Sequence, residues 1–351
     1  MAFEEFIGNV RAKRYLEKYL SSNQIPHLLL FSGIEGIGKK HIALAFAQAQ
    51  QKQDPTKTFY PDISVLKLEG KAGLHSIQSI RKMIEEMDLA PYEEESKVII
   101  IDDCDKMLPT SANALLKSFE EPKRTKIILI TSRMSSLLPT ILSRAQVIRF
   151  DPIDTVEVSE YLQKVKQIPR EKADKIAIRA KGSLGCALDH LEDSFDHEDL
   201  LFSLLASQNS NFFELSCSIK TLCDCIETKK KKYAKDILQD TKEMSASIRQ
   251  QVEQEYEGEL QKIQMTLIDK IFEDIFDFFR DVQLVSLGSS ENLFFQERKK
   301  EITELFQQGR LIPLVRVHSL LQKARLSIER SIPMQTVLEA LFLELDMVKK
   351  R

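Results

Sequence analysis

Gly33-Ile34-Glu35-Gly36-Ile37-Gly38-Lys39-Lys40 is the stretch that decides the fold of the first part of this chain. It follows an apolar segment, His27–Ser32, that we expect to be a buried strand, and it opens a segment with helical periodicity, Lys39–Gln51. The glycines Gly33, Gly36 and Gly38 let backbone N–H groups approach a phosphate, the helix start adds positive potential, and Lys39 supplies a charge for the β- and γ-phosphates. The pattern therefore predicts a phosphate-binding loop between a strand and a helix.

The position after Lys39 departs from what ATP hydrolysis needs. A serine or threonine there would give its hydroxyl group to Mg²⁺, but the residue is Lys40. Lysine has no oxygen to offer, and its charge repels a metal ion. We expect a phosphate to bind the backbone amides and the two lysines, and we expect Mg²⁺ binding to be disfavoured.

Two carboxylates and a threonine are candidates for the rest of the site. Asp102 and Asp103 follow the apolar segment Val98–Ile101, at the end of a strand where α/β sheets bind ligands. Asp102 lies where a Mg²⁺-holding aspartate belongs, and Asp103 lies where many ATPases place a longer glutamate that polarises water. The alternative is that these acidic residues simply end a strand. Thr131 ends another apolar segment and is either a γ-phosphate contact or an ordinary strand end.

Short apolar segments alternate with helical patterns over residues 1–150, which predicts βα units on a parallel sheet covered on both faces. The candidate strands are His27–Ser32, Ile63–Leu68, Val98–Ile101, Ile127–Thr131 and Val147–Phe150, and the candidate helices between them are Lys39–Gln51, His75–Met87 and Ser111–Glu120.

No strand candidate follows residue 150. The segments Val156–Lys166, Arg170–Ala180 and Leu184–Leu191 are helical in pattern. No proline lies between Arg170 and Ile312, and proline is the residue that breaks helices. We therefore predict an α/β P-loop domain with a five-stranded parallel sheet at 1–150, a small helical lid at 151–205 and an all-helical domain at 206–351.

Composition excludes several classes of protein. Hydrophobic residues make up 43% and charged residues 29% of the 351 residues, with a formal net charge of −3, which is typical of a soluble globular protein. The first residues lack the apolar segment of a signal peptide, and no segment is long enough to span a bilayer, so we expect a cytoplasmic protein without a membrane partner. Since charge is nearly balanced in both parts, any contact with DNA is expected to be local or shared with partners.

Further motifs carry a resemblance to a known family. The segment Ser111–Lys117 (SANALLK) is followed by Glu120-Glu121-Pro122, and Leu138–Arg144 (LPTILSR) precedes the last strand candidate. Together they resemble the bacterial clamp-loader branch of AAA+ proteins. The Ser-Arg-Cys motif of that family is matched by Ser143-Arg144, with alanine in place of cysteine. The resemblance implies that Arg144 is an arginine finger acting in trans on the ATP site of a neighbouring subunit; the alternative is an ordinary arginine on a helix surface.

Within this family the chain is similar to the delta-prime subunits of DNA polymerase III. Gly185 stands in Gly182-Ser183-Leu184-Gly185 where the ATP-hydrolysing subunits carry a lid arginine. The resemblance implies a heteropentamer with gamma/tau-like and delta-like subunits, which opens a sliding clamp and places it on primer-template DNA. In it this chain would join a collar through its last domain and have weak or no ATPase activity of its own.

The same resemblance bears on ligands. It implies ATP or another nucleotide as the ligand of the phosphate loop. Many bacterial relatives carry a four-cysteine zinc module after the first helix, but Ala47–Pro61 contains no cysteine. We therefore expect no zinc and no other bound metal.

Three other functions remain open from the sequence. The chain is alternatively an ATP-hydrolysing AAA+ motor subunit, either gamma/tau-like or helicase-like, which ATP hydrolysis by the isolated chain with Mg²⁺ would identify. A small-molecule kinase with a P-loop is disfavoured by the long helical second half. A scaffold with a vestigial nucleotide domain would bind a motor subunit but no clamp.

Overall fold

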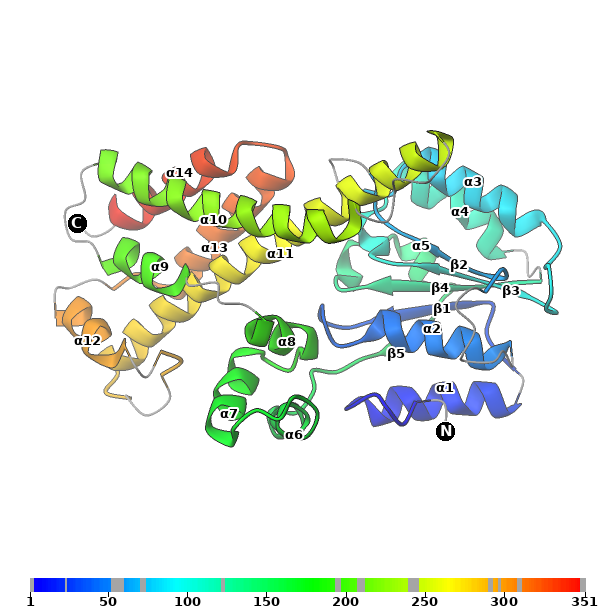
Figure 1. Cartoon of the computed structure of the whole chain (residues 1–351), viewed down its shortest axis with the longest axis horizontal. Coiled ribbons are helices and arrows are strands. Elements are labelled where there is room, and N and C mark those ends of the chain that lie inside the picture. Colours follow the sequence, from blue (N-terminus) through cyan, green and yellow to red (C-terminus); the bar gives the residue numbers. More distant parts are fainter. Residues whose placement is uncertain are drawn as a thin grey trace. The chain divides into compact units, whose positions relative to one another are not determined.

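The chain divides into two compact units, Met1–Ser194 and Phe195–Arg351, and each is described by itself (Figure 1). The computed structural model describes residues 3–22, 24–51, 60–69, 74–120, 124–192, 197–206, 212–238, 246–289, 293–295, 298–307 and 311–347.

A five-stranded parallel sheet forms the centre of the first unit. Its strands are β1 (Leu28–Ser32), β2 (Ile63–Leu66), β3 (Lys97–Ile101), β4 (Thr125–Thr131) and β5 (Gln146–Arg149). Their order across the sheet is β2-β3-β4-β1-β5, with every neighbouring pair parallel. Because the strands run in one direction, the residues that follow β1, β3 and β4 lie along the same edge of the sheet.

Helices cover both faces of this sheet (Figure 1). The helices α1 (Val10–Ser22) and α2 (Lys39–Gln50) pack on one face, and α3 (Ile77–Asp88), α4 (Pro109–Glu120) and α5 (Pro139–Leu142) pack on the other. Successive residues of a strand point to opposite faces. β1 accordingly gives Leu29 and Phe31 to the first core and Leu28 and Leu30 to the second. Burial on both faces explains why the strands are continuously apolar.

Three further helices complete the first unit. They are α6 (Thr155–Lys166), α7 (Arg170–Arg179) and α8 (Leu184–Glu192), with bounds close to those of the predicted lid helices. They pack around Ile153, Leu162 and Ala177. The N-terminus of α6 is capped by the Asp154 carboxylate, which accepts the N–H of Val156 at 2.8 Å, a favourable use of an acidic side chain at a helix start.

The second unit is helical, and its six helices share one buried cluster over the part that is described. They are α9 (His197–Ala206), α10 (Phe212–Leu238), α11 (Ala246–Ser286), α12 (Lys299–Gln307), α13 (Leu314–Glu329) and α14 (Met334–Met347). Phe202 of α9 packs edge-on against Phe278 and Phe295, with ring centroids 5.3 and 4.9 Å away. The predicted lid extends to residue 205, whereas α9 packs within this second unit; the division into three domains stays a prediction.

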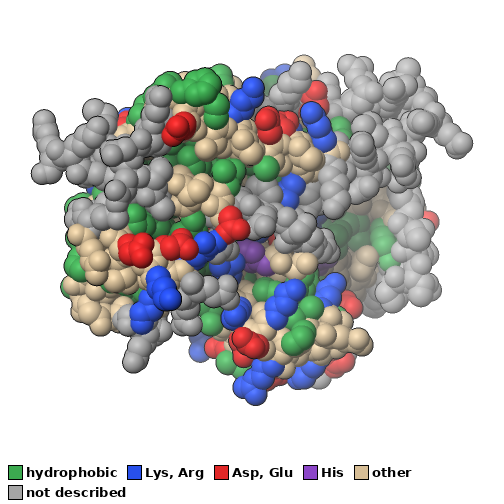
Figure 2. All heavy atoms as spheres, turned by 60° about the vertical axis from the view of Figure 1, so that its left-hand side comes forward, with side chains coloured by type: hydrophobic (Ala, Val, Ile, Leu, Met, Phe, Trp, Pro, Cys, Tyr) green, Lys and Arg blue, Asp and Glu red, His purple; other side chains and the backbone are tan. Residues whose placement is uncertain are grey.

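The surface carries mixed charges. On the described part of the face shown in Figure 2, Lys and Arg side chains are interspersed with Asp and Glu side chains. This mixture agrees with the formal net charge of −3. Among the described helices, none has the length and apolar character that a membrane span requires.

Candidate functional site

The predicted phosphate loop connects β1 to α2, at the edge of the sheet where the strands end. Gly36 and Gly38 have φ angles of 75° and 86°, in the left-handed region that side chains with a Cβ rarely adopt. Gly33 is required for a different reason, since a Cβ there would lie 2.4 Å from the carbonyl oxygen of Phe150. A Cβ at Gly38 would meet no described atom within 4 Å. The space beside the start of α2 is therefore open, and these residues fit a phosphate group.

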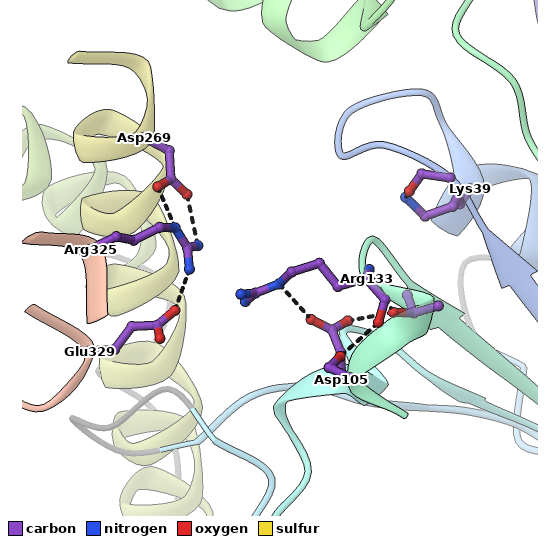
Figure 3. A network of polar contacts seen from close by, with 9 residues as sticks. Lys39, Asp105, Arg133, Asp269, Arg325 and Glu329 are labelled. Atoms are coloured by element: carbon purple, nitrogen blue, oxygen red, sulfur yellow. Dashed lines mark hydrogen bonds and ion pairs between the residues drawn. The ribbon is translucent and has the colours of Figure 1, made fainter. Parts of the chain in front are cut away.

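Lys39 lies within this loop. It is the first residue of α2 and is only 7% exposed. Its Nζ donates hydrogen bonds to the carbonyl oxygens of Gly33 and Ile34, both at 2.7 Å, and Figure 3 shows its position. These bonds compensate the ammonium group for the loss of water, which would otherwise make its burial costly.

Lys40 and Asp102, the two residues at the predicted metal position, form an ion pair. The Lys40 Nζ lies 3.0 Å from Asp102 Oδ2, and the two side chains are 33% and 11% exposed. The other carboxylate oxygen, Oδ1, accepts the N–H of Asp103 at 3.2 Å. Mg²⁺ requires oxygen ligands at about 2.0–2.1 Å in an octahedral arrangement. The residues present do not fit it, because an ammonium group already contacts the carboxylate that would hold the metal.

Thr131, at the end of β4, uses its hydroxyl group within the domain. It is fully buried, donates to Asp105 Oδ1 at 2.8 Å and accepts the N–H of Arg133 at 2.9 Å. The Nε of Arg133 lies 3.6 Å from Asp105 Oδ2 (Figure 3). A hydroxyl group has one hydrogen to donate. In this structure Thr131 therefore fixes the turn that contains Asp105 and gives no donor to a phosphate.

His75 lies behind the strand-end carboxylates and was not among the predicted site residues. It is fully buried, and its Nε2–H donates to the carbonyl oxygen of Asp102 at 2.6 Å. Burial lowers the pKa of His75, although the charges of Asp103 and Asp102 act in the opposite direction. The neutral imidazole thus holds the backbone of the residue whose carboxylate pairs with Lys40. His75 also forms an isolated parallel β-bridge with Met107. Both Met107 and Asp102 are distant from His75 in sequence, so no local sequence pattern predicts these contacts.

The start of α8, in the predicted lid, contacts the phosphate loop directly. The N–H of Gly185, in the first turn of α8, donates to the carbonyl oxygen of Gly36 at 2.7 Å. A Cβ at Gly36 would lie 2.3 Å from Ser183 Oγ, and a Cβ at Gly185 would lie 3.0 Å from the Cα of Gly36. Gly185, which the resemblance aligns with the lid arginine of the ATP-hydrolysing subunits, thus allows close packing of two backbones.

Comparison with known proteins points to one family. A family model described as "DNA polymerase III, delta subunit" matches residues 8–154. The delta′ subunit of DNA polymerase III from Bacillus subtilis is 29% identical over 43% of this chain and 50% of its own length. The gamma subunit from Buchnera aphidicola is 27% identical over 55% of this chain and 59% of its own length. The tau subunit from B. subtilis is 25% identical over 86% of this chain and 54% of its own length.

The chain is a relative of the clamp-loader subunits of DNA polymerase III. It spans about half of the length of these clamp-loader relatives. Among solved structures, a gamma subunit-related protein of DNA polymerase III from Thermotoga maritima aligns with a TM-score of 0.39 and 16% identity, over 95% of this chain and 99% of its own. RuvB from T. maritima aligns with a TM-score of 0.43 and 17% identity, over 63% and 71%. The predicted architecture, an α/β unit on a five-stranded parallel sheet followed by helices, is confirmed.

Arg144 of this clamp-loader relative lies on the surface, just after the short helix α5. Its Nη1 donates to the carbonyl oxygen of Thr140 at 3.0 Å and to Ser143 Oγ at 3.5 Å. Ile141, one turn earlier, is fully buried and anchors α5 in the core. These hydrogen bonds stay within one segment of chain, so the role of Arg144 in trans stays a prediction.

Some predictions fall partly outside the described residues. Glu121 and Pro122 of the predicted motif lie outside them, as do residues 52–59 of Ala47–Pro61, the segment on which the expectation of no zinc rests. In the described parts of the chain, no group of three or more His, Cys, Asp or Glu side chains is arranged to hold a metal ion. The expectation of no zinc stays a prediction.

Proposed function

We propose that this chain is a delta-prime-like subunit of a bacterial clamp loader. It joins gamma/tau-like and delta-like subunits in a heteropentamer that loads the sliding clamp onto primer-template DNA during replication. Its own ATPase activity is weak or absent, and it presents Arg144 to the ATP site of a neighbouring subunit. The observation that carries this proposal is the ion pair between Lys40 and Asp102, because it occupies the position that hydrolysis requires for Mg²⁺.

Two further features of the site support a subunit that does not hydrolyse ATP. The hydroxyl group of Thr131, at the γ-phosphate sensor position, donates to Asp105. Gly185, at the position of the lid arginine, packs against Gly36 of the phosphate loop. Three positions that contribute to ATP hydrolysis in motor subunits are thus used here for contacts within the first unit.

Two observations support the proposed role of Arg144 as an arginine finger. Arg144 is exposed, which leaves its side chain accessible to a neighbouring subunit. Its backbone is fixed, since the N–H groups of Arg144 and Ala145 both donate to the carbonyl oxygen of the buried Ile141. A guanidinium group on a fixed stem can stabilise the charge that develops on a transferred phosphate in another subunit.

The test is ATP turnover by the complex reconstituted with gamma/tau-like and delta-like subunits, clamp and primed DNA. We expect Arg144→Ala to leave assembly intact, measured by gel filtration, and to lower clamp-stimulated turnover. The loss at the site that Arg144 serves should be about 10³-fold or more. Arg81→Ala, which removes another exposed arginine of the same unit, on α3, is the matched control. Unchanged turnover in the Arg144→Ala complex would contradict the proposal.

A gamma/tau-like motor subunit is the second candidate. It is favoured by the alignment with the B. subtilis tau subunit over 86% of this chain, compared with 43% for the delta′ subunit. The isolated chain distinguishes the two candidates. Steady ATP hydrolysis with Mg²⁺ by the wild-type chain identifies a motor, whereas hydrolysis that appears only in Lys40→Thr supports the delta-prime-like assignment.

A further inference from the structure

The phosphate loop combines an intact cradle for phosphate with a blocked position for metal. We propose that this loop binds a nucleoside di- or triphosphate without a divalent cation, and that the Lys40 ammonium group stands in the place of the metal. The inference rests on the proposed function, because it concerns the ligand of the same P-loop domain.

The first argument is the direct pairing of the two positions that would share a metal. In a P-loop NTPase, the residue after the loop lysine and the aspartate that ends a central strand hold Mg²⁺ between them. Here these residues are Lys40 and Asp102, whose Nζ and Oδ2 atoms are 3.0 Å apart. A positive charge is therefore supplied by the chain itself, on a side chain that is 33% exposed and borders the loop.

The second argument is that the neighbouring oxygen atoms are engaged. The remaining oxygen of Asp102 accepts the N–H of Asp103. The carboxylate of Asp105 accepts from Thr131 through Oδ1 and pairs with Arg133 through Oδ2. A Mg²⁺ ion binds carboxylates and waters in a strict octahedron. To bind Asp102 Oδ2 it would have to displace the Lys40 ammonium group, and it would compete with an N–H, hydroxyl or guanidinium donor at each of the other three oxygens.

The third argument is that the cradle itself is preserved. Gly36 and Gly38 keep the left-handed backbone that the loop needs, although only Gly36 is also required by packing. The space beside Gly38 is open, and it lies at the N-terminus of a helix of 12 residues. Lys39 is held at the loop by carbonyl oxygens. Two lysines and the loop amides thus offer positive charge to a polyphosphate.

The charge balance gives the proposal a measurable consequence. With Lys40 present, the negative charge of Asp102 is compensated, and a polyphosphate is not repelled. Lys40→Ala leaves the Asp102 carboxylate uncompensated near the phosphates, which should weaken binding about tenfold or more. The double variant Lys40→Ala/Asp102→Asn removes both charges and should recover part of that loss, a non-additivity expected only for groups that interact.

The decisive experiment measures binding of a fluorescent ADP, with competition by unlabelled ATP, to the wild-type chain in EDTA and in Mg²⁺. Because Lys40 already occupies the metal position beside Asp102, we expect the Kd for nucleotide to differ by less than about twofold between EDTA and Mg²⁺. In Lys40→Thr, which supplies the missing hydroxyl group, Mg²⁺ should tighten binding about tenfold or more. Lys18→Thr, an exposed lysine of α1, is the matched control and should behave as the wild type.

A direct metal readout completes the test. Mn²⁺ signals in electron paramagnetic resonance should report no ion held at the wild-type site with nucleotide bound, beyond that carried by free nucleotide. A wild-type chain that binds nucleotide only with Mg²⁺, or that binds none in either condition, overturns the inference. The comparison of nucleotide binding in EDTA and in Mg²⁺ uses the wild-type chain. A folding defect in Lys40→Thr therefore does not affect its outcome. The turnover test of Arg144 uses the whole complex and fails or succeeds independently of this result.

Discussion

His75 connects the chemistry of one buried side chain to the stability of the first unit. Its Nε2–H donates to the carbonyl oxygen of Asp102, and among the described residues its Nδ1 has no hydrogen-bond partner. Burial lowers the pKa of His75, and the opposing charges of Asp103, Asp102 and Glu69 do not restore it. A protonated ring would bury a charge and an unsatisfied N–H group. The folded state therefore favours the neutral imidazole.

This preference predicts a pH dependence of stability. As the pH falls below about 6.5, the usual pKa of histidine, the unfolded chain binds a proton that the folded chain refuses. The free energy of unfolding should therefore decrease with falling pH, until the pH reaches the lowered pKa of the folded state. His75→Gln keeps an N–H donor and should remove this part of the slope. Urea unfolding of both proteins at a series of pH values measures it, and parallel pH profiles for the two would contradict the prediction.

Two different requirements favour glycine in the phosphate loop: a positive φ angle and close packing against the predicted lid. Gly36 and Gly38 both have positive φ, so alanine at either position strains the backbone by about 1–2 kcal/mol. Only at Gly36 would the new Cβ also meet the lid, 2.3 Å from Ser183 Oγ and 3.3 Å from the Cα of Gly185. Ser183 Oγ accepts the N–H of Cys186 at 3.2 Å at the start of α8.

We expect Gly36→Ala to lower the free energy of unfolding by about 1 kcal/mol more than Gly38→Ala, because Ser183 must move and weaken its helix cap. In a Ser183→Ala background this extra cost should shrink, since the contacting oxygen is gone. Urea unfolding measures the free energy of unfolding of Gly36→Ala and Gly38→Ala, each in the wild-type and in the Ser183→Ala background. Equal losses for Gly36→Ala and Gly38→Ala would show that the lid does not pack on the loop as described.

The same elements show what could be predicted from the sequence. The segment Val98–Ile101 of β3 is predictable because its four residues are all apolar, as burial on both faces of a sheet requires. β4 begins at Thr125, earlier than the predicted Ile127, because two polar residues extend it. Thr125 donates to the carbonyl oxygen of Met87, and Lys126 donates to that of Ile25. Such distant partners satisfy polar groups in a strand, and no local pattern reveals them.

The candidate site also has features that the local sequence predicts and contacts that it does not. The spacing of the glycines and Lys39 predicted the phosphate loop, because backbone conformation and charge there depend on neighbouring residues. Lys40 and Asp102 were each predicted at the metal position, but their ion pair joins residues from different elements. The same holds for Thr131 with Asp105. These contacts depend on the order of strands in the sheet, which the sequence pattern does not specify.

Each of the two compact units has its own means of cohesion. The first contains the two cores that flank the sheet and the smaller cluster of α6–α8, and the second contains one cluster shared by its helices. In the second unit, Arg325 of α13 also donates from Nε and Nη2 to Asp269 of α11, at 2.6 and 2.9 Å (Figure 3). These hydrogen bonds raise the pKa of Arg325, so the pair stays charged and joins the two helices.

Separate cores predict separate unfolding transitions in calorimetry. Ile275→Ala removes a fully buried side chain of α11, at a cost of about 2–5 kcal/mol, and should lower only the transition of the second unit. Gly36→Ala should lower only the transition of the first. A nucleotide that binds the phosphate loop should raise that first transition alone, because a ligand stabilises the unit that holds its site. A single transition shifted by both variants would mean that the two units unfold as one, and that binding at the loop also stabilises the second unit.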